Sequence, residues 1–196
     1  MRTFKYNPKG SKLNFIPIGD VHWGAKECDE ELFTDYLKWI RKEPDTVALL
    51  MGDLIDSSLK SSPGSSMYES KMNVDDQYDA MTDMLQPIRN KLVGLIEGNH
   101  EERVYRETGF NISKVMAREL GVPYFGHSEL FRVKVGKQRY DFFVTHGSSG
   151  STTPTGRLNS LLKISAHFKA DIYCMGHVHD LFTMTDLTQS FGGERK

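Results

Sequence analysis

The sequence predicts an α/β protein whose main sheet is largely parallel and covered by helices on both faces. Short, nearly continuous apolar segments such as residues 46–51 are typical of strands buried on both faces. Other segments, such as residues 29–42, place their apolar side chains at helical intervals. Because the two kinds of segment alternate along the chain, consecutive strands are expected to run parallel, with helices crossing between them.

The first half of the chain gives this alternation most clearly. Asp29 is a suitable N-cap for the first helix, and Pro44 follows its end. Strand and helix take turns at residues 13–19, 29–42, 46–51, 74–90 and 91–96.

A hairpin interrupts the alternation in the second half. Residues 130–135 and 139–145 are predicted strands, and a turn containing Gly136 joins them. The other elements expected in this half are helices at 101–107, 111–120 and 157–168 and strands at 171–175 and 181–187.

Two segments rich in Ser, Gly, Thr and Pro are predicted to be surface loops with some mobility. They are residues 56–73 and 147–156. Potential site residues lie on both sides of the first loop and have to meet in one site, so the loop is no domain linker. Residues 1–196 are therefore expected to form a single domain.

Composition and charge favour a soluble, folded protein without a membrane partner. The chain is 38% hydrophobic and 26% charged. Its net charge of -1 lacks the basic excess of a dedicated nucleic-acid binder. Cys28 and Cys174 have no zinc-type spacing, and no apolar run matches a signal peptide or a membrane span. A cytoplasmic location with reduced thiols is the expectation.

Five predicted strands end in a glycine beside Asp, Asn or His, and five of the seven histidines lie in these motifs. The carboxyl ends of parallel strands share one edge of a sheet, so these side chains should gather there. Asp, Asn and His together suit Mn²⁺, Fe or Zn²⁺, and the absence of cysteine argues against a structural zinc site. The motifs are Gly19-Asp20-Val21-His22, Gly52-Asp53-Leu54-Ile55-Asp56, Gly98-Asn99-His100-Glu101, His146-Gly147 and Gly176-His177-Val178-His179.

This ordered set of motifs resembles the calcineurin-like metallophosphoesterase superfamily, in its compact bacterial or phage-type members, over about residues 16–179. The resemblance implies a four-layer α/β/β/α sandwich of two mixed sheets flanked by helices. It also implies two divalent metal ions, Mn²⁺ first, with Fe, Zn²⁺ or Ni²⁺ as alternatives. Asp53 would bridge the two ions. The first ion would be held by Asp20, His22 and His179, and the second by Asn99, His146 and His177.

The resemblance further implies phosphoester hydrolysis by a hydroxide held between the two ions. His100 would not bind metal. It would orient or protonate the leaving oxygen, with help from a neighbouring carboxylate. Asp53 and His100 are thus the predicted catalytic residues.

Several neighbouring residues each have two interpretations. Arg103 could bind a substrate phosphate oxygen or simply be solvated. Trp23 could stack on a substrate ring or pack against a loop. Asp56 is expected to support the ligands rather than bind metal. Glu101 and Glu102 could cap the helix that they begin.

The substrate is expected to be a phosphodiester or nucleotide, which includes nucleic acid. The protein Ser/Thr phosphatase branch usually carries Arg after Gly-Asp-x-x-Asp, but here Ser57 and Ser58 follow. A phosphomonoesterase, including a protein phosphatase, is therefore the alternative. A non-catalytic scaffold is an alternative of another class, and the complete set of ligands argues against it.

Only 17 residues follow His179, and they end in a polar segment. Family members usually finish their second sheet with strands in this region. Either the sheet is short, or its edge strand pairs with another subunit to form a homodimer.

Overall fold

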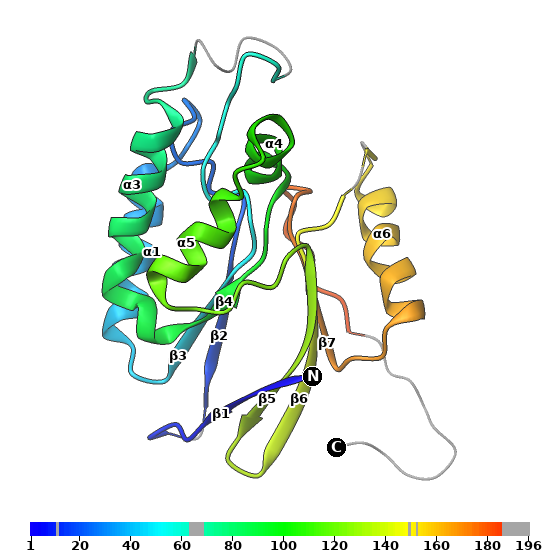
Figure 1. Cartoon of the computed structure of the whole chain (residues 1–196). Helices are drawn as coiled ribbons and strands as arrows, with labels where there is room; N and C mark the ends of the chain where they lie inside the picture. Colours follow the sequence, from blue (N-terminus) through cyan, green and yellow to red (C-terminus); the bar gives the residue numbers. More distant parts are fainter. Residues whose placement is uncertain (11, 63–68, 149, 152, 186–196) are drawn as a thin grey trace.

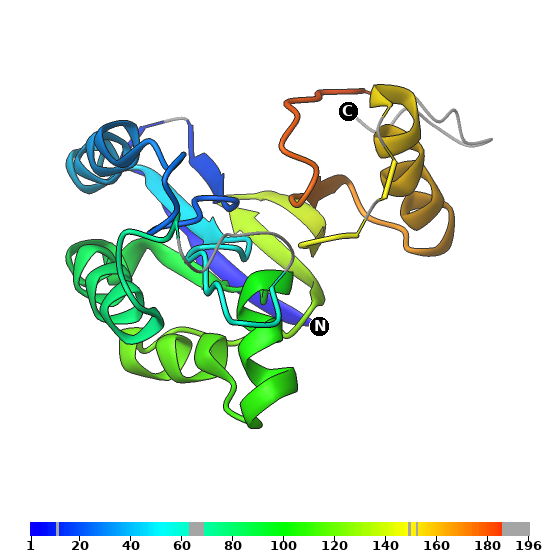
Figure 2. The same cartoon turned by 90° about the horizontal axis from the view of Figure 1, so that it is seen from above.

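In the computed structural model of the chain, two β-sheets lie between a group of helices on one side and helix α6 (Pro154–His167) on the other (Figure 1). The structure describes residues 1–10, 12–62, 69–148, 150–151 and 153–185. Viewed from above, α6 stands on the opposite side of the strands from the other helices (Figure 2). The predicted four-layer α/β/β/α arrangement is confirmed.

The first sheet is parallel throughout, with the order β2-β3-β4. Its strands are β2 (Asn14–Ile18), β3 (Thr46–Leu50) and β4 (Leu92–Leu95). Every residue of β3 is buried, because successive side chains enter two different hydrophobic clusters. Only the second sheet is mixed, so the expectation of two mixed sheets was wrong for this one.

Three helices cover the outer face of the first sheet (Figure 1). They are α1 (Glu30–Lys42), α3 (Val74–Leu85) and α5 (Ile112–Leu120). Asp29 caps α1 as predicted, with its carboxylate accepting from Leu32 N at 3.0 Å.

The predicted helix over residues 74–90 is shorter than expected. After Leu85 the chain tightens into a 3₁₀ helix, η1 (Gln86–Lys91). Pro87 stands at the start of this turn, and its ring cannot donate the backbone hydrogen bond that would continue α3.

The second sheet has the order β1-β5-β6-β7. The hairpin of β5 (Ser128–Val135) and β6 (Gln138–Thr145) is antiparallel, as predicted, and β7 (Ile172–Met175) pairs parallel with β6. The strand β1 (Arg2–Tyr6) was not predicted, because its polar residues alternate with only two aromatic ones. It pairs parallel with β5 and packs its aromatic side chains between the sheets.

Two sequence-based expectations about loops and strands need correction. Asp56, Ser57, Ser58 and Ser62 are buried, so the start of the 56–73 segment is no surface loop. Residues 181–185 form no strand, and residues 186–187 of the predicted last strand lie outside the described residues. The strand β7 is therefore the edge of its sheet in the described part of the chain.

Cys28 and Cys174 are free thiols, in line with the expectation of reduced cysteines. Among the described residues, no helix combines the length and apolar character that crossing a membrane requires.

Candidate metal centre

The predicted ligands meet where the strands of both sheets end. Two of them follow β2, one follows β3, and one begins α4 (Asn99–Thr108), the helix after β4. The others follow β6 and β7. In this order the ligands are Asp20 and His22, Asp53, Asn99, His146, and finally His177 and His179.

The backbone at these ligands is strained. Six non-glycine residues of the described chain have positive φ, a region that L-residues rarely adopt. Five of the six are predicted ligands. Strain of this kind is kept only where surrounding structure enforces it, and it concentrates at functional sites. The six are Asp20, His22, Asp53, Ser57, His177 and His179.

Backbone hydrogen bonds join the first two ligand loops. Asp20 N donates to Gly52 O, and His22 N donates to Asp53 O, both at 3.0 Å. A Cβ added at Gly98 would collide with the backbone nitrogen of Asp53, so only glycine allows this approach. The relative positions of Asp20, His22 and Asp53 are thus fixed by the backbone.

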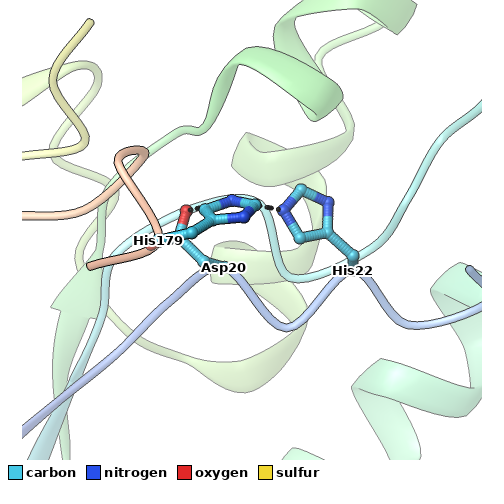
Figure 3. Close-up of side chains that lie close together, drawn as sticks. All are labelled: Asp20, His22 and His179. Carbon is cyan, nitrogen blue, oxygen red and sulfur yellow. Dashed lines mark hydrogen bonds and ion pairs between the residues drawn. The ribbon is translucent and has the colours of Figure 1, made fainter. Parts of the chain in front are cut away.

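Asp20, His22 and His179 form the first group of possible ligands (Figure 3). The Nε2 atoms of the two histidines face one another at 3.1 Å, and His179 Nε2 lies 3.6 Å from Asp20 Oδ1. One ligand atom from each residue lies within 4.8 Å of the others. Two imidazole nitrogens and a carboxylate at this spacing suit a divalent transition-metal ion.

Asp53, His146 and His177 form the second group. Asn99 joins it, because its Oδ1 lies 3.0 Å from His146 Nε2 and 2.7 Å from His177 Nδ1. Asp53 Oδ2 lies 3.2 Å from His146 Nε2 and 3.8 Å from His22 Nε2. The Asp53 carboxylate therefore stands between the two groups, where a bridging ligand would be.

His100 stands at the rim of the site and contacts a second carboxylate. Its Nδ1 lies 2.6 Å from Asp56 O and 3.4 Å from Asp56 Oδ1, and its Nε2 lies 4.0 Å from Asp53 Oδ2. The Ser58 hydroxyl donates to the other oxygen of Asp56. Burial alone would lower the pKa of His100, but Asp56 and Asp53 raise it. His22, Asp53 and His100 also satisfy the spacing of a ligand group.

The charge states of His22 and Asp53 fit metal binding. Burial, followed by the neighbouring His100, lowers the pKa of His22 to about 4, although Asp53 acts in the opposite direction. The ring is therefore neutral near pH 7 and offers a lone pair. Burial would raise the pKa of Asp53, but His146 and His100 hold it below its usual range, so the carboxylate is ionised.

The two predicted substrate contacts differ in their surroundings. Trp23 is only 8% exposed and packs 6.1 Å from Phe33, measured between ring centroids. This burial favours packing and speaks against stacking on a substrate. Arg103 lies on α4 near His100, and its Nη1 donates to Ser62 Oγ at 2.8 Å. A substrate role for Arg103 stays a prediction.

Glu101 is a residue whose role the sequence did not reveal. A cap of its own helix was one interpretation, but Gly98 occupies the N-cap of α4 and Glu101 is only 1% exposed. Its carboxylate instead accepts hydrogen bonds from the loop that carries Asp53. Only the presence of an acid in the Gly-Asn-His-Glu motif could have drawn attention to it.

A cavity of about 590 Å³ opens beside Asn99 and His146. Residues of α6, including Ser160 and Lys163, form the opposite wall. Lys163 forms no ion pair within the described part of the chain, so its ammonium group is available to a ligand.

Comparison with known families agrees with this geometry. A family model described as calcineurin-like phosphoesterase matches residues 13–181, which include all the predicted ligands. No curated protein is significantly similar to the chain.

Proposed function

The chain belongs to the calcineurin-like phosphoesterase family, and we propose that it uses two divalent metal ions, with Mn²⁺ as the first choice, to hydrolyse a phosphodiester or nucleotide. One observation carries the proposal. Asp53 Oδ2 stands between two groups of ligand atoms, 3.2 Å from a histidine nitrogen of one and 3.8 Å from a histidine nitrogen of the other. A carboxylate in that position suits a pair of ions that share it.

The predicted ligands divide into two groups, one for each ion. Asp20, His22 and His179 would hold one ion, and Asn99, His146 and His177 would hold the other. When bound, the ions would supply positive charge that polarises the phosphoryl group and lowers the pKa of water.

His100 would serve the leaving group. Its Nδ1 is oriented by Asp56, so Nε2 is the ring nitrogen that faces the site. The raised pKa of His100 increases the protonated fraction near neutral pH. A proton held at Nε2 could pass to the leaving oxygen as its bond to phosphorus breaks.

Two observations support a diester or nucleotide over a small monoester. The cavity of about 590 Å³ beside Asn99 and His146 has the size of sites that bind small organic molecules. A diester or nucleotide carries an organic group that needs such room. In addition, Ser57 and Ser58 follow Asp56, so no arginine stands directly after this motif to clamp a monoester dianion.

The test compares bis-p-nitrophenyl phosphate with p-nitrophenyl phosphate in the presence of Mn²⁺. We expect faster turnover of the diester. Preference for the monoester would contradict the proposed substrate class but leave the metal site intact. No turnover of either compound by folded, metal-loaded protein would contradict the proposal that the chain is a phosphoesterase.

A further inference from the structure

We propose that Glu101 is a positioning residue, whose buried carboxylate holds the Asp53–Asp56 loop against helix α4 and so fixes the separation between Asp53 and His100. The consequences for catalysis and for metal affinity rest on the proposed function. The consequence for loop geometry does not.

Three backbone N–H groups converge on the Glu101 carboxylate. Asp53 N donates to Oε2 at 2.9 Å, while Leu54 N and Ile55 N donate to Oε1 at 2.7 and 3.3 Å. Successive N–H groups that point to one side form a concave site for an anion. Since the Glu101 side chain is 1% exposed, the three donors replace the water that the carboxylate has lost.

These bonds complete the hydrogen bonding of a strained loop. Asp53 and Ser57 both have positive φ, so the loop cannot form regular backbone pairs at every residue. Asp56 N donates to Trp23 O, and Ser57 N donates to the buried side chain of Gln77. Without Glu101, the N–H groups of Asp53, Leu54 and Ile55 would lose their acceptor in the interior.

The same loop controls His100, which is adjacent to Glu101 on α4. His100 N donates to Asp53 Oδ1 at 2.9 Å, and His100 Nδ1 contacts Asp56. The loop therefore positions Asp53 for metal and His100 through Asp56. Glu101 therefore joins the helix that carries His100 to the loop that carries Asp53.

Glu101→Gln tests this directly, because it keeps the size of the side chain. One amide oxygen can still accept from Leu54 and Ile55, but the NH₂ group then faces the N–H of Asp53. We expect faster hydrogen exchange at the Asp53 amide in the metal-free protein. Affinity for Mn²⁺, measured by calorimetry, should fall about 10–100-fold, the usual effect of losing a group that orients a ligand. Glu101→Ala should show both effects more strongly.

Two variants serve as controls. Glu119→Gln removes an exposed carboxylate that accepts from Tyr78, and it should change neither measurement. Leu85→Ala creates a cavity in the core away from the site, so it should lower the melting temperature yet keep the Mn²⁺ affinity. A loss of affinity in Leu85→Ala equal to that in Glu101→Gln would show that general destabilisation explains the effect, and it would overturn the proposal.

Wild-type exchange at Asp53 and wild-type Mn²⁺ affinity in Glu101→Gln would also overturn it. Failure of the proposed function is separately visible. If the wild-type protein hydrolyses no phosphoester but Glu101→Gln still binds Mn²⁺ more weakly, the positioning role stands without the enzymatic one.

Discussion

The two sides of the candidate metal centre differ sharply in how firmly the fold holds them. Asp53 and His146 are 1% and 3% exposed, and both follow strands with buried ends. The side chain of His179 is 57% exposed, and the nearby helix α6 has no buried residue. Asp53 and His146 are thus held by the core between the sheets, whereas His179 lies at the exposed edge of the site.

This difference separates two roles. Preorganised ligands bind metal without first having to be ordered, whereas an exposed side chain loses conformational entropy when it binds. The ion between Asp53, His146 and His177 should therefore bind more tightly than the ion between Asp20, His22 and His179. The metal content of His179→Ala protein tests that ranking.

Removing the Asp53 carboxylate should have the largest effect. Asp53→Ala deletes the carboxylate that contacts ligands of both groups, so diesterase activity should disappear. The measurement is turnover of bis-p-nitrophenyl phosphate with Mn²⁺ in excess. Activity within about tenfold of wild type, a barrier change of only ~1.4 kcal/mol, would contradict a central role for Asp53.

His100→Ala should reduce kcat by roughly 10²–10⁴-fold, the usual contribution of a general acid or base. Metal content should stay at the wild-type level, because both ligand groups are complete without His100. Activity and metal content measured on the same preparation separate the two effects. Loss of a metal ion in His100→Ala would instead make His100 a ligand.

His179→Ala tests the exposed side of the comparison. We expect loss of the weaker ion and retention of the tighter one, because Asp53, Asn99, His146 and His177 are untouched. Elemental analysis after dialysis should find about half the wild-type metal content. Loss of both ions would show that binding of the second ion depends on the first, and it would contradict the predicted ranking.

Lys163→Ala tests the wall of the cavity that α6 supplies. A lost contact between an ammonium group and a phosphate oxygen at an exposed site should raise KM for the diester roughly two- to fivefold, with kcat little changed. Lys137→Ala, in the distant turn between β5 and β6, is the control. An unchanged KM would remove Lys163 from the substrate site.

The smallest effect concerns Cys174 on β7. Burial raises the pKa of this thiol to about 11, so it stays protonated in the folded protein over a range in which an unfolded chain is ionised. The folded state then binds the extra proton, and this contribution to stability is lost as pH rises from about 9 towards 11. Alkylation of Cys28→Ser protein should accelerate only in that range. Rapid alkylation near pH 8 would show that the Cys174 thiol is accessible and ionised there, which would contradict the raised pKa.

The sequence predicted that these side chains gather at one place because each follows an apolar strand in a local motif. The common location of Asp20, Asp53 and Asn99 could be inferred from that pattern and from the rule that the carboxyl ends of parallel strands share one edge. The burial of Trp23 and the hydrogen bonds of Glu101 depend on contacts between segments far apart in the chain. No local pattern reports such contacts.

The same limit explains the errors in the fold. The strand β1 lacks an apolar run and is recognisable only by its pairing with β5, more than a hundred residues away. The Ser-rich start of the 56–73 segment is buried because Gln77 and Arg103 bind Ser57 N and Ser62 Oγ. Composition alone predicted a surface loop there.

The most direct test of a shared metal centre is a titration of metal-free protein with Mn²⁺. For the wild-type chain we predict two ions per chain, the first binding more tightly than the second, and for Asp53→Ala we predict weakened binding of both. A single ion in the wild-type protein, or two ions bound with unchanged affinity in Asp53→Ala, would contradict the bridging role of Asp53.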